Sequence, residues 1–136
     1  MGIIRLGYVE IRVTDMEEAK RHYGRTLGLE QVDEKDGAVY FRGWDEWEHH
    51  SVVLREEGVG VQKFGYKVQS PEDLDYFEKK AKDFGATVER MSKGETHEVS
   101  DGLRITSPSE HTFELYHDMT FTDSQVGFVN PEVFPR

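Results

Sequence analysis

Residues 8–28 read YVEIRVTDMEEAKRHYGRTLG and contain the signals of a strand followed directly by a helix. The first six residues alternate between apolar and polar side chains, which is typical of a half-buried strand. Asp15 is placed to cap a helix with Glu18 at its third position, and Gly28 is placed where a left-handed helix end is expected. We therefore predict a strand over 8–13 and a helix over 16–27. Its apolar stripe would consist of Met16, Ala19, Tyr23 and Leu27.

The same order of signals returns in residues 64–85, FGYKVQSPEDLDYFEKKAKDFG, at an offset of about 55 to 57 residues. Here Ser70 is the predicted cap, Pro71 the first helical residue and Gly85 the left-handed end. Asp73 lies near the positive end of this second helix. The apolar stripe predicted for it consists of Leu74, Phe77, Ala81 and Phe84. The repeat indicates two similar units that share one core.

Short β-like runs separated by turn residues follow each predicted helix, so each half of the chain reads βαβββ. Two such units would pair through their open sheet faces. The expected fold is α+β, with one eight-stranded, curved, open sheet and a helix on the outside for each half. The predicted further strands are 29–33, 38–44 and 50–55 in the first half and 87–90, 103–106 and 112–117 in the second. We assign the repeats to 3–58 and 61–120, the domain to 1–122, and 123–136 to a tail or interdomain linker.

Composition restricts the possible functions of the chain. Its 136 residues include 17 basic and 27 acidic side chains, a formal charge of -10, which disfavours nucleic-acid binding through phosphate contacts. There is no cysteine, which excludes thiolate chemistry. No apolar run is long enough for a membrane helix, and the N-terminus lacks a signal-peptide pattern. We expect a cytoplasmic protein with neither nucleic acid nor membrane as a partner.

Several motifs resemble the vicinal oxygen chelate superfamily, which includes glyoxalase, bleomycin-resistance proteins and extradiol dioxygenases. Besides the βαβββ repeat, these motifs are RVTDMEEA (12–19), HY (22–23), LGL (27–29) and SPSEHTFELY (107–116). Four further stretches are similar to the N-terminal domain of catechol 2,3-dioxygenases. They are SVVLRE (51–56), FGYKV (64–68), FELY (113–116) and VNPE (129–132) followed by PR (135–136).

The resemblance implies the first, non-catalytic domain of a two-domain extradiol enzyme, with a scaffolding role. In that family a second domain holds Fe(II) through two histidines and one glutamate, so this chain itself would carry no metal and no catalytic residue. The implied partners are the C-terminal catalytic domain of the same polypeptide and further copies in a homo-oligomer. Two alternatives stay open: a single-domain glyoxalase-like metalloenzyme, and a metal-free protein that sequesters a planar aromatic drug.

The superfamily builds its metal sites from four repeat-related positions, one on the opening strand and one on the closing strand of each repeat. In this sequence those positions hold Tyr8, Val53, Lys63 or Phe64, and Glu114. Only Glu114 is an ordinary ligand, since Tyr8 would first have to lose a proton with a pKa near 10. We therefore expect no metal at these positions and a structural role for Glu114, either paired with a lysine or arginine or reached by water.

The histidines do not form a ready ligand set in the sequence. His49 and His50 are adjacent and would face opposite sides of a strand. His111 and His117 share a strand parity that excludes Glu114, while His22 and His97 are predicted on a helix and in a polar loop. We expect all six to be solvated or hydrogen-bonded.

Three other features call for structural explanations. Trp44 and Trp47 are expected to pack at a strand end, although such aromatics also line ligand grooves. Lys79, Lys80 and Lys82 are expected on a solvated helix face. The apolar residues Phe128 to Phe134 would lack their partner if the second domain were absent, so we expect the isolated chain to self-associate.

Overall fold

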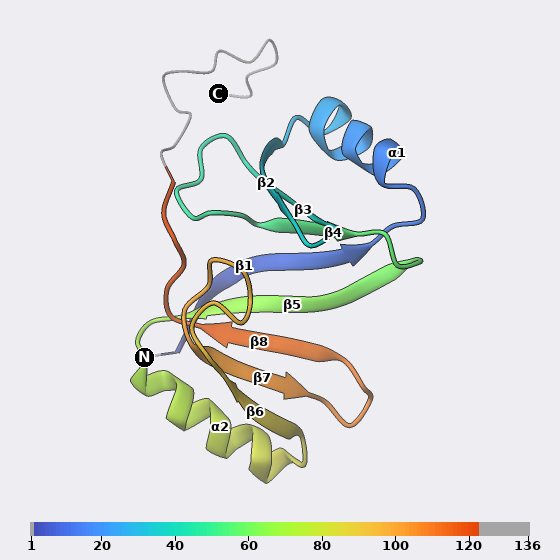
Figure 1. Ribbon diagram of the computed structural model, residues 1–136. Coiled ribbons are helices and arrows are strands. Elements are labelled where there is room, and N and C mark those ends of the chain that lie inside the picture. Colours follow the sequence, from blue (N-terminus) through green and yellow to red (C-terminus); the bar gives the residue numbers. More distant parts are fainter. Residues whose placement is uncertain (1, 123–136) are drawn as a thin grey trace.

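The computed structural model describes residues 2–122 and contains one eight-stranded mixed sheet with a helical segment from each repeat on its outside (Figure 1). The strand order is β2-β3-β4-β1-β5-β8-β7-β6. The first repeat contributes β1 (Ile3–Arg12), β2 (Glu30–Lys35), β3 (Ala38–Arg42) and β4 (Val52–Arg55); the second contributes β5 (Gly60–Val68), β6 (Thr87–Met91), β7 (Gly102–Thr106) and β8 (Thr112–Tyr116). The predicted fold class is confirmed.

The two repeats meet where β1 pairs antiparallel with β5. Within each repeat the opening strand pairs in parallel with the closing one: Glu10 lies opposite Val53, and Gly65 lies opposite Glu114. The strands that carry the four repeat-related positions, β4, β1, β5 and β8, are thus the four central strands of the sheet.

The two faces of the sheet differ sharply in chemistry because side chains alternate along each strand. Apolar residues face the helices, as Phe41 and Leu54 do in the first repeat and Leu103 and Leu115 in the second. The opposite, concave face carries tyrosines and buried carboxylates, among them Glu114. Two apolar clusters therefore hold the helices to one face, while the concave face combines polar contacts with two smaller apolar clusters.

The first helix differs from the prediction in its second half. Asp15 caps α1 (Met16–Lys20) by accepting a hydrogen bond from the Glu18 N–H at 3.1 Å, as expected. The chain then continues as a π-helical segment over Arg21–Thr26. The wider π turn changes the angular spacing of the side chains, so the stripe ends at Tyr23. Leu27 is consequently exposed instead of buried.

The second helix, α2 (Glu72–Phe84), begins with a different cap from the one predicted. The Ser70 side chain does not accept from the helix N–H groups; its N–H and hydroxyl both donate to the Asp73 carboxylate, at 3.2 and 3.3 Å. At the other end Gly85 is left-handed, with φ of 99°, as predicted. Leu74 and Phe77 pack into the core, whereas Phe84, predicted in the same stripe, is exposed.

A long connection, residues 92–101, links β6 to β7 and lies over the concave face (Figure 1). It brings Thr96 and His97 of the second repeat to residues of the first. The predicted boundary at residue 122 and the Phe128–Phe134 segment involve residues outside the described range. None of the helices within residues 2–122 has the length and apolar character needed to cross a membrane.

We predict that Gly85→Val destabilises the protein by about 1 kcal/mol or more, because a β-branched residue is strained at the positive φ of this helix end. Lys80→Ala is the control, since Lys80 is exposed and contacts the Tyr76 ring through a cation–π interaction at 5.7 Å. Urea denaturation of both variants measures the difference. Equal losses of stability would contradict the assigned helix end.

Candidate functional site

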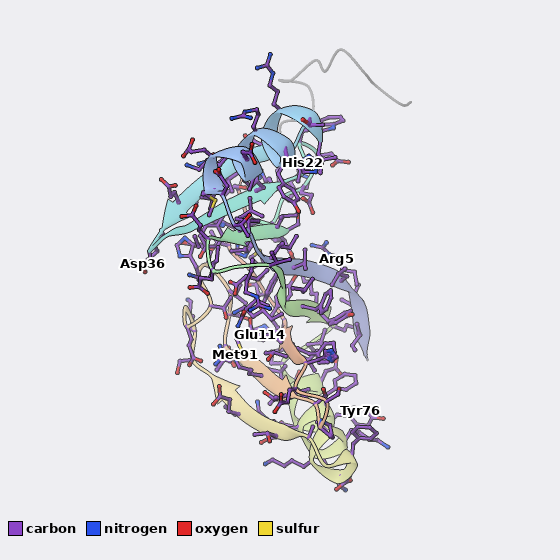
Figure 2. All side chains as sticks on the ribbon, turned by 90° about the vertical axis from the view of Figure 1, so that its right-hand side faces the viewer. Arg5, His22, Asp36, Tyr76, Met91 and Glu114 are labelled. Atoms are coloured by element: carbon purple, nitrogen blue, oxygen red, sulfur yellow. The ribbon has the colours of Figure 1, made fainter. Side chains whose placement is uncertain are left out.

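Glu114 occupies the centre of the concave face, between the two halves of the molecule (Figure 2). Its side chain is completely buried. The Tyr8 hydroxyl donates to Oε1, and so does the Thr96 hydroxyl at 2.9 Å. Lys63 Nζ and Arg104 Nε both donate to Oε2 at 3.0 Å. The expected pairing of Glu114 with basic residues is confirmed, and it joins Tyr8 of the first repeat to three residues of the second.

The structure distinguishes between Lys63 and Phe64 as the repeat-related counterpart of Tyr8. Lys63 points to the concave face, because its ammonium group contacts Glu114. Phe64 stacks on Phe113, with ring centroids 6.1 Å apart. The four positions predicted to correspond to a metal site are therefore Tyr8, Val53, Lys63 and Glu114, and the cavity near them is lined by the first three.

Tyr8 acts as a hydrogen-bond donor at this site. Burial, followed by the negative charge of Glu114, raises the pKa of the Tyr8 hydroxyl well above its ordinary value of 10.0. The ring lies across Gly65 of β5, where a Cβ would come within 2.2 Å of it. The sheet thus holds Tyr8 as a neutral phenol beside Glu114, and a phenolate ligand is disfavoured.

The charge on Glu114 is stabilised by its surroundings. Burial alone would raise the pKa of this carboxyl, but Lys63 and the hydrogen bonds from Tyr8, Lys63 and Thr96 hold it below its ordinary value of 4.5. A ferrous ion here would have to displace these donors and lie beside the Lys63 ammonium group, and Val53 offers no ligand atom. The residues at these four positions do not fit an iron centre.

A second buried carboxylate, Glu48, lies on the same face near the N-terminal end of β1. Arg5 donates to Glu48 at 2.6 Å, Lys67 at 2.5 Å and the Tyr116 hydroxyl at 2.9 Å. Sequence reasoning missed Glu48 because it lies outside the regular strands, in the segment between β3 and β4. No local pattern indicates that three donors from β1, β5 and β8 converge there.

His49, His50 and His97 gather at one edge of the concave face, together with Asp33. His97 Nε2 lies 2.6 Å from Asp33 Oδ2, and His49 Nε2 lies 3.3 Å from the same oxygen. The Nδ1 atoms of His49 and His50 are 2.9 Å apart. The expectation that these adjacent rings face opposite sides is wrong, because they precede β4 and do not follow strand alternation.

Burial governs the protonation of these rings. It lowers the pKa of His49, and it lowers that of His50 to about 3, with the neighbouring rings adding to the effect. His97, expected in a solvated or hydrogen-bonded state, is hydrogen-bonded to Asp33. Tyr40 packs against all three rings, with centroid distances of 4.8 to 5.9 Å.

The remaining candidate residues lie away from this cluster. His22 and His111 are exposed, and His117 contacts Asp101 at 3.1 Å. Figure 2 places His22 on the outer side of the first helix, far from Glu114. Trp47 is 58% exposed, so the predicted packing does not cover it. The lysines of the predicted solvated face, Lys79, Lys80 and Lys82, are exposed as expected.

Comparison with known proteins identifies dioxygenases as relatives of the chain, in agreement with the resemblance in the sequence. Residues 61–120 match the family model described as the catechol 2,3-dioxygenase-like N-terminal domain. A metapyrocatechase of Pseudomonas sp. (strain CF600) is 36% identical over 99% of this chain, and the match covers 45% of that protein. A manganese-dependent 2,3-dihydroxybiphenyl 1,2-dioxygenase of Geobacillus genomosp. 3 is 26% identical, over 86% of this chain and 38% of the relative.

Solved structures of extradiol dioxygenases share the fold. The 2,3-dioxygenase LapB from Pseudomonas sp. KL28 superimposes with a TM-score of 0.82 and 34% identity, covering 89% of this chain and 43% of the other. Homoprotocatechuate 2,3-dioxygenase from Arthrobacter globiformis also gives 0.82, with 32% identity over 90% of this chain and 38% of the other. The chain thus spans less than half the length of these relatives.

We predict that Glu114→Gln lowers the free energy of unfolding by about 3 kcal/mol, because it leaves Lys63 and Arg104 beside a neutral amide. Glu89→Gln is the matched control: Glu89 also pairs with Arg104, but its side chain is 60% exposed, so its loss should cost about 1 kcal/mol or less. Urea denaturation at neutral pH compares the two. Similar losses would show that the buried carboxylate contributes no more than the exposed one.

Acid should remove the contribution of Glu114. Because its folded-state pKa lies below 4.5, the unfolded state takes up its proton first as the pH falls. The stabilisation is therefore complete above pH 4.5 and is lost as the pH falls through the folded-state pKa. Unfolding free energies from about pH 6 to about pH 3 should decline more steeply in the wild type than in Glu114→Gln. Parallel curves would contradict this assignment.

Proposed function

We propose that this chain, an N-terminal domain of the catechol 2,3-dioxygenase-like family, is the non-catalytic domain of a two-domain extradiol dioxygenase. The longer protein would cleave catechols next to their two hydroxyl groups with Fe(II) and dioxygen. The domain described here would act as a scaffold that supports the catalytic domain. The Glu114 network supports this proposal, because two of the repeat-related positions, Tyr8 and Lys63, hold side chains that donate to Glu114.

The partner that fits this proposal is a C-terminal domain of the same polypeptide, which the greater length of the relatives supports. The N-terminal part of β1 offers apolar surface to it. β4 pairs with β1 only over Val9–Arg12, and the preceding residues Ile3, Ile4 and Leu6 are between 49 and 57% exposed. The proposal includes a homo-oligomer, since a second copy of the chain would also cover such a surface. It also includes a cytoplasmic location.

The decisive experiment is aerobic ring cleavage. The 136-residue chain supplied with ferrous iron and catechol should give no yellow ring-opened product, because Lys63 and Val53 replace ligands at the repeat-related positions. The same chain extended by its C-terminal domain should give the product. Turnover by the chain alone would overturn the proposed non-catalytic role.

Iron content supplies the control in the two-domain protein. Glu114→Gln should leave the iron bound per folded molecule unchanged, since Glu114 is not an iron ligand in this proposal. Elemental analysis of the folded fraction measures it, with Glu89→Gln treated in parallel. Loss of iron in Glu114→Gln alone would contradict the proposal even if both variants fold.

A further inference from the structure

We infer that Asp33, His49 and His97 form a binding site for a divalent metal ion of the zinc class, which links the two repeats. The ligand atoms would be one carboxylate oxygen of Asp33 and the Nε2 atoms of both histidines. The three ligand groups lie within 4.8 Å of one another. This site uses none of the repeat-related positions Tyr8, Val53, Lys63 and Glu114, and it does not depend on the proposed function.

Two local irregularities bring Asp33 and His97 together. The pairing of β2 with β3 shifts register between Gln31 and Asp33, and such a bulge redirects the side chain that follows it. Asp33 thereby lies opposite Tyr40, whose ring contacts the histidines. In the connection from β6 to β7, Glu98 adopts a left-handed conformation, with φ of 62°, directly after His97. A non-glycine residue with positive φ is uncommon and often marks a functional segment.

The donor set suits a borderline metal ion. Two neutral imidazoles and one carboxylate bind Zn²⁺ with bonds of about 2.0–2.2 Å, so the donors around a tetrahedral ion lie about 3.3–3.6 Å apart. Asp33 Oδ2 already lies 2.6 Å from His97 Nε2 and 3.3 Å from His49 Nε2. A small outward movement of the loop side chain His97 would open this hydrogen-bonded arrangement to an ion.

A second layer of contacts fixes the orientation of His49. Its Nδ1 lies 2.9 Å from Nδ1 of His50, so one ring donates to the other. A histidine that binds a metal through Nε2 commonly donates its Nδ1–H to a neighbouring acceptor, which sets the tautomer. His50 can accept that hydrogen bond, because its own Nδ1 faces His49. His50 Nε2 is buried and has no hydrogen-bond partner within residues 2–122, and it would carry the remaining proton.

The ligands are accessible from outside. The side chains of Asp33, His97 and His49 are 33, 15 and 9% exposed. A cavity of about 560 Å³ adjoins the site and is lined in part by His97 and Glu98. Lys35 and Lys93 also line this cavity, so the carboxylate of Asp33 at the site and those of Glu98 and Asp118 in the cavity wall are needed to favour a cation there. The ion can thus reach the ligands without unfolding the core, while water fills its remaining coordination positions.

The test is zinc binding by the chelator-treated 136-residue chain. Isothermal titration calorimetry should show one Zn²⁺ per chain, and the thermal midpoint should rise with zinc concentration. Asp33→Asn and His97→Gln should each weaken the affinity at least about tenfold, because they remove one of three ligands. Both residues are partly exposed, so the variants should fold, and far-UV circular dichroism without zinc confirms it.

His117→Gln is the matched control, because His117 also contacts a single aspartate, Asp101, but no second histidine among residues 2–122 joins that pair. It should bind zinc as the wild type does. Cobalt(II) substitution supplies a second readout, a visible spectrum of nitrogen and oxygen coordination that disappears in His97→Gln. Absence of zinc binding by the wild type, wild-type affinity in Asp33→Asn or His97→Gln, or loss of binding in His117→Gln would overturn the inference.

Discussion

The burial of the Glu114 carboxylate at the seam between the repeats is the constraint on which the concave face depends. An isolated carboxylate would cost several kcal/mol to bury, so its charge must be met by donors. Tyr8 comes from the first repeat, whereas Lys63, Thr96 and Arg104 come from the second. Misalignment of β1 against β5 would separate these groups. The network therefore favours the observed pairing of the halves over a slipped one.

The same principle extends beyond Glu114 and explains how a chain with a charge of -10 keeps acidic groups inside. Glu48 is met by Arg5 and Lys67, and Glu10 is met by Arg55 at 3.1 Å. Each of these buried carboxylates therefore has at least one basic side chain beside it. The apolar clusters that hold the helices lie on the opposite face, whereas smaller apolar clusters share the concave face with the buried ion pairs.

Local signals in the sequence predict the strands and the end of α2, but not every helical turn or long-range contact. The alternation of apolar and polar residues predicts the strands, and its repetition predicts the sheet. Gly85 predicts the end of α2. These signals can be recognised from residues close together in the sequence. The π-helical turn after Lys20 has no such signal, since it depends on how the helix packs. The cluster of His49, His50 and His97 was missed for a related reason. Its members lie in connections whose paths are set by long-range packing.

Glu114 and Asp33 show how the surroundings of a carboxylate decide what it can bind. Glu114 is fully buried and both its oxygens already accept from two donors each, so an external ion would have to break four interactions. Asp33 is partly exposed, and one of its oxygens is shared by two imidazoles whose protons an ion can replace. Glu114 thus has a structural role in this chain. Asp33, at the edge of the sheet, can exchange its hydrogen bonds with the two imidazoles for a bond to a metal ion.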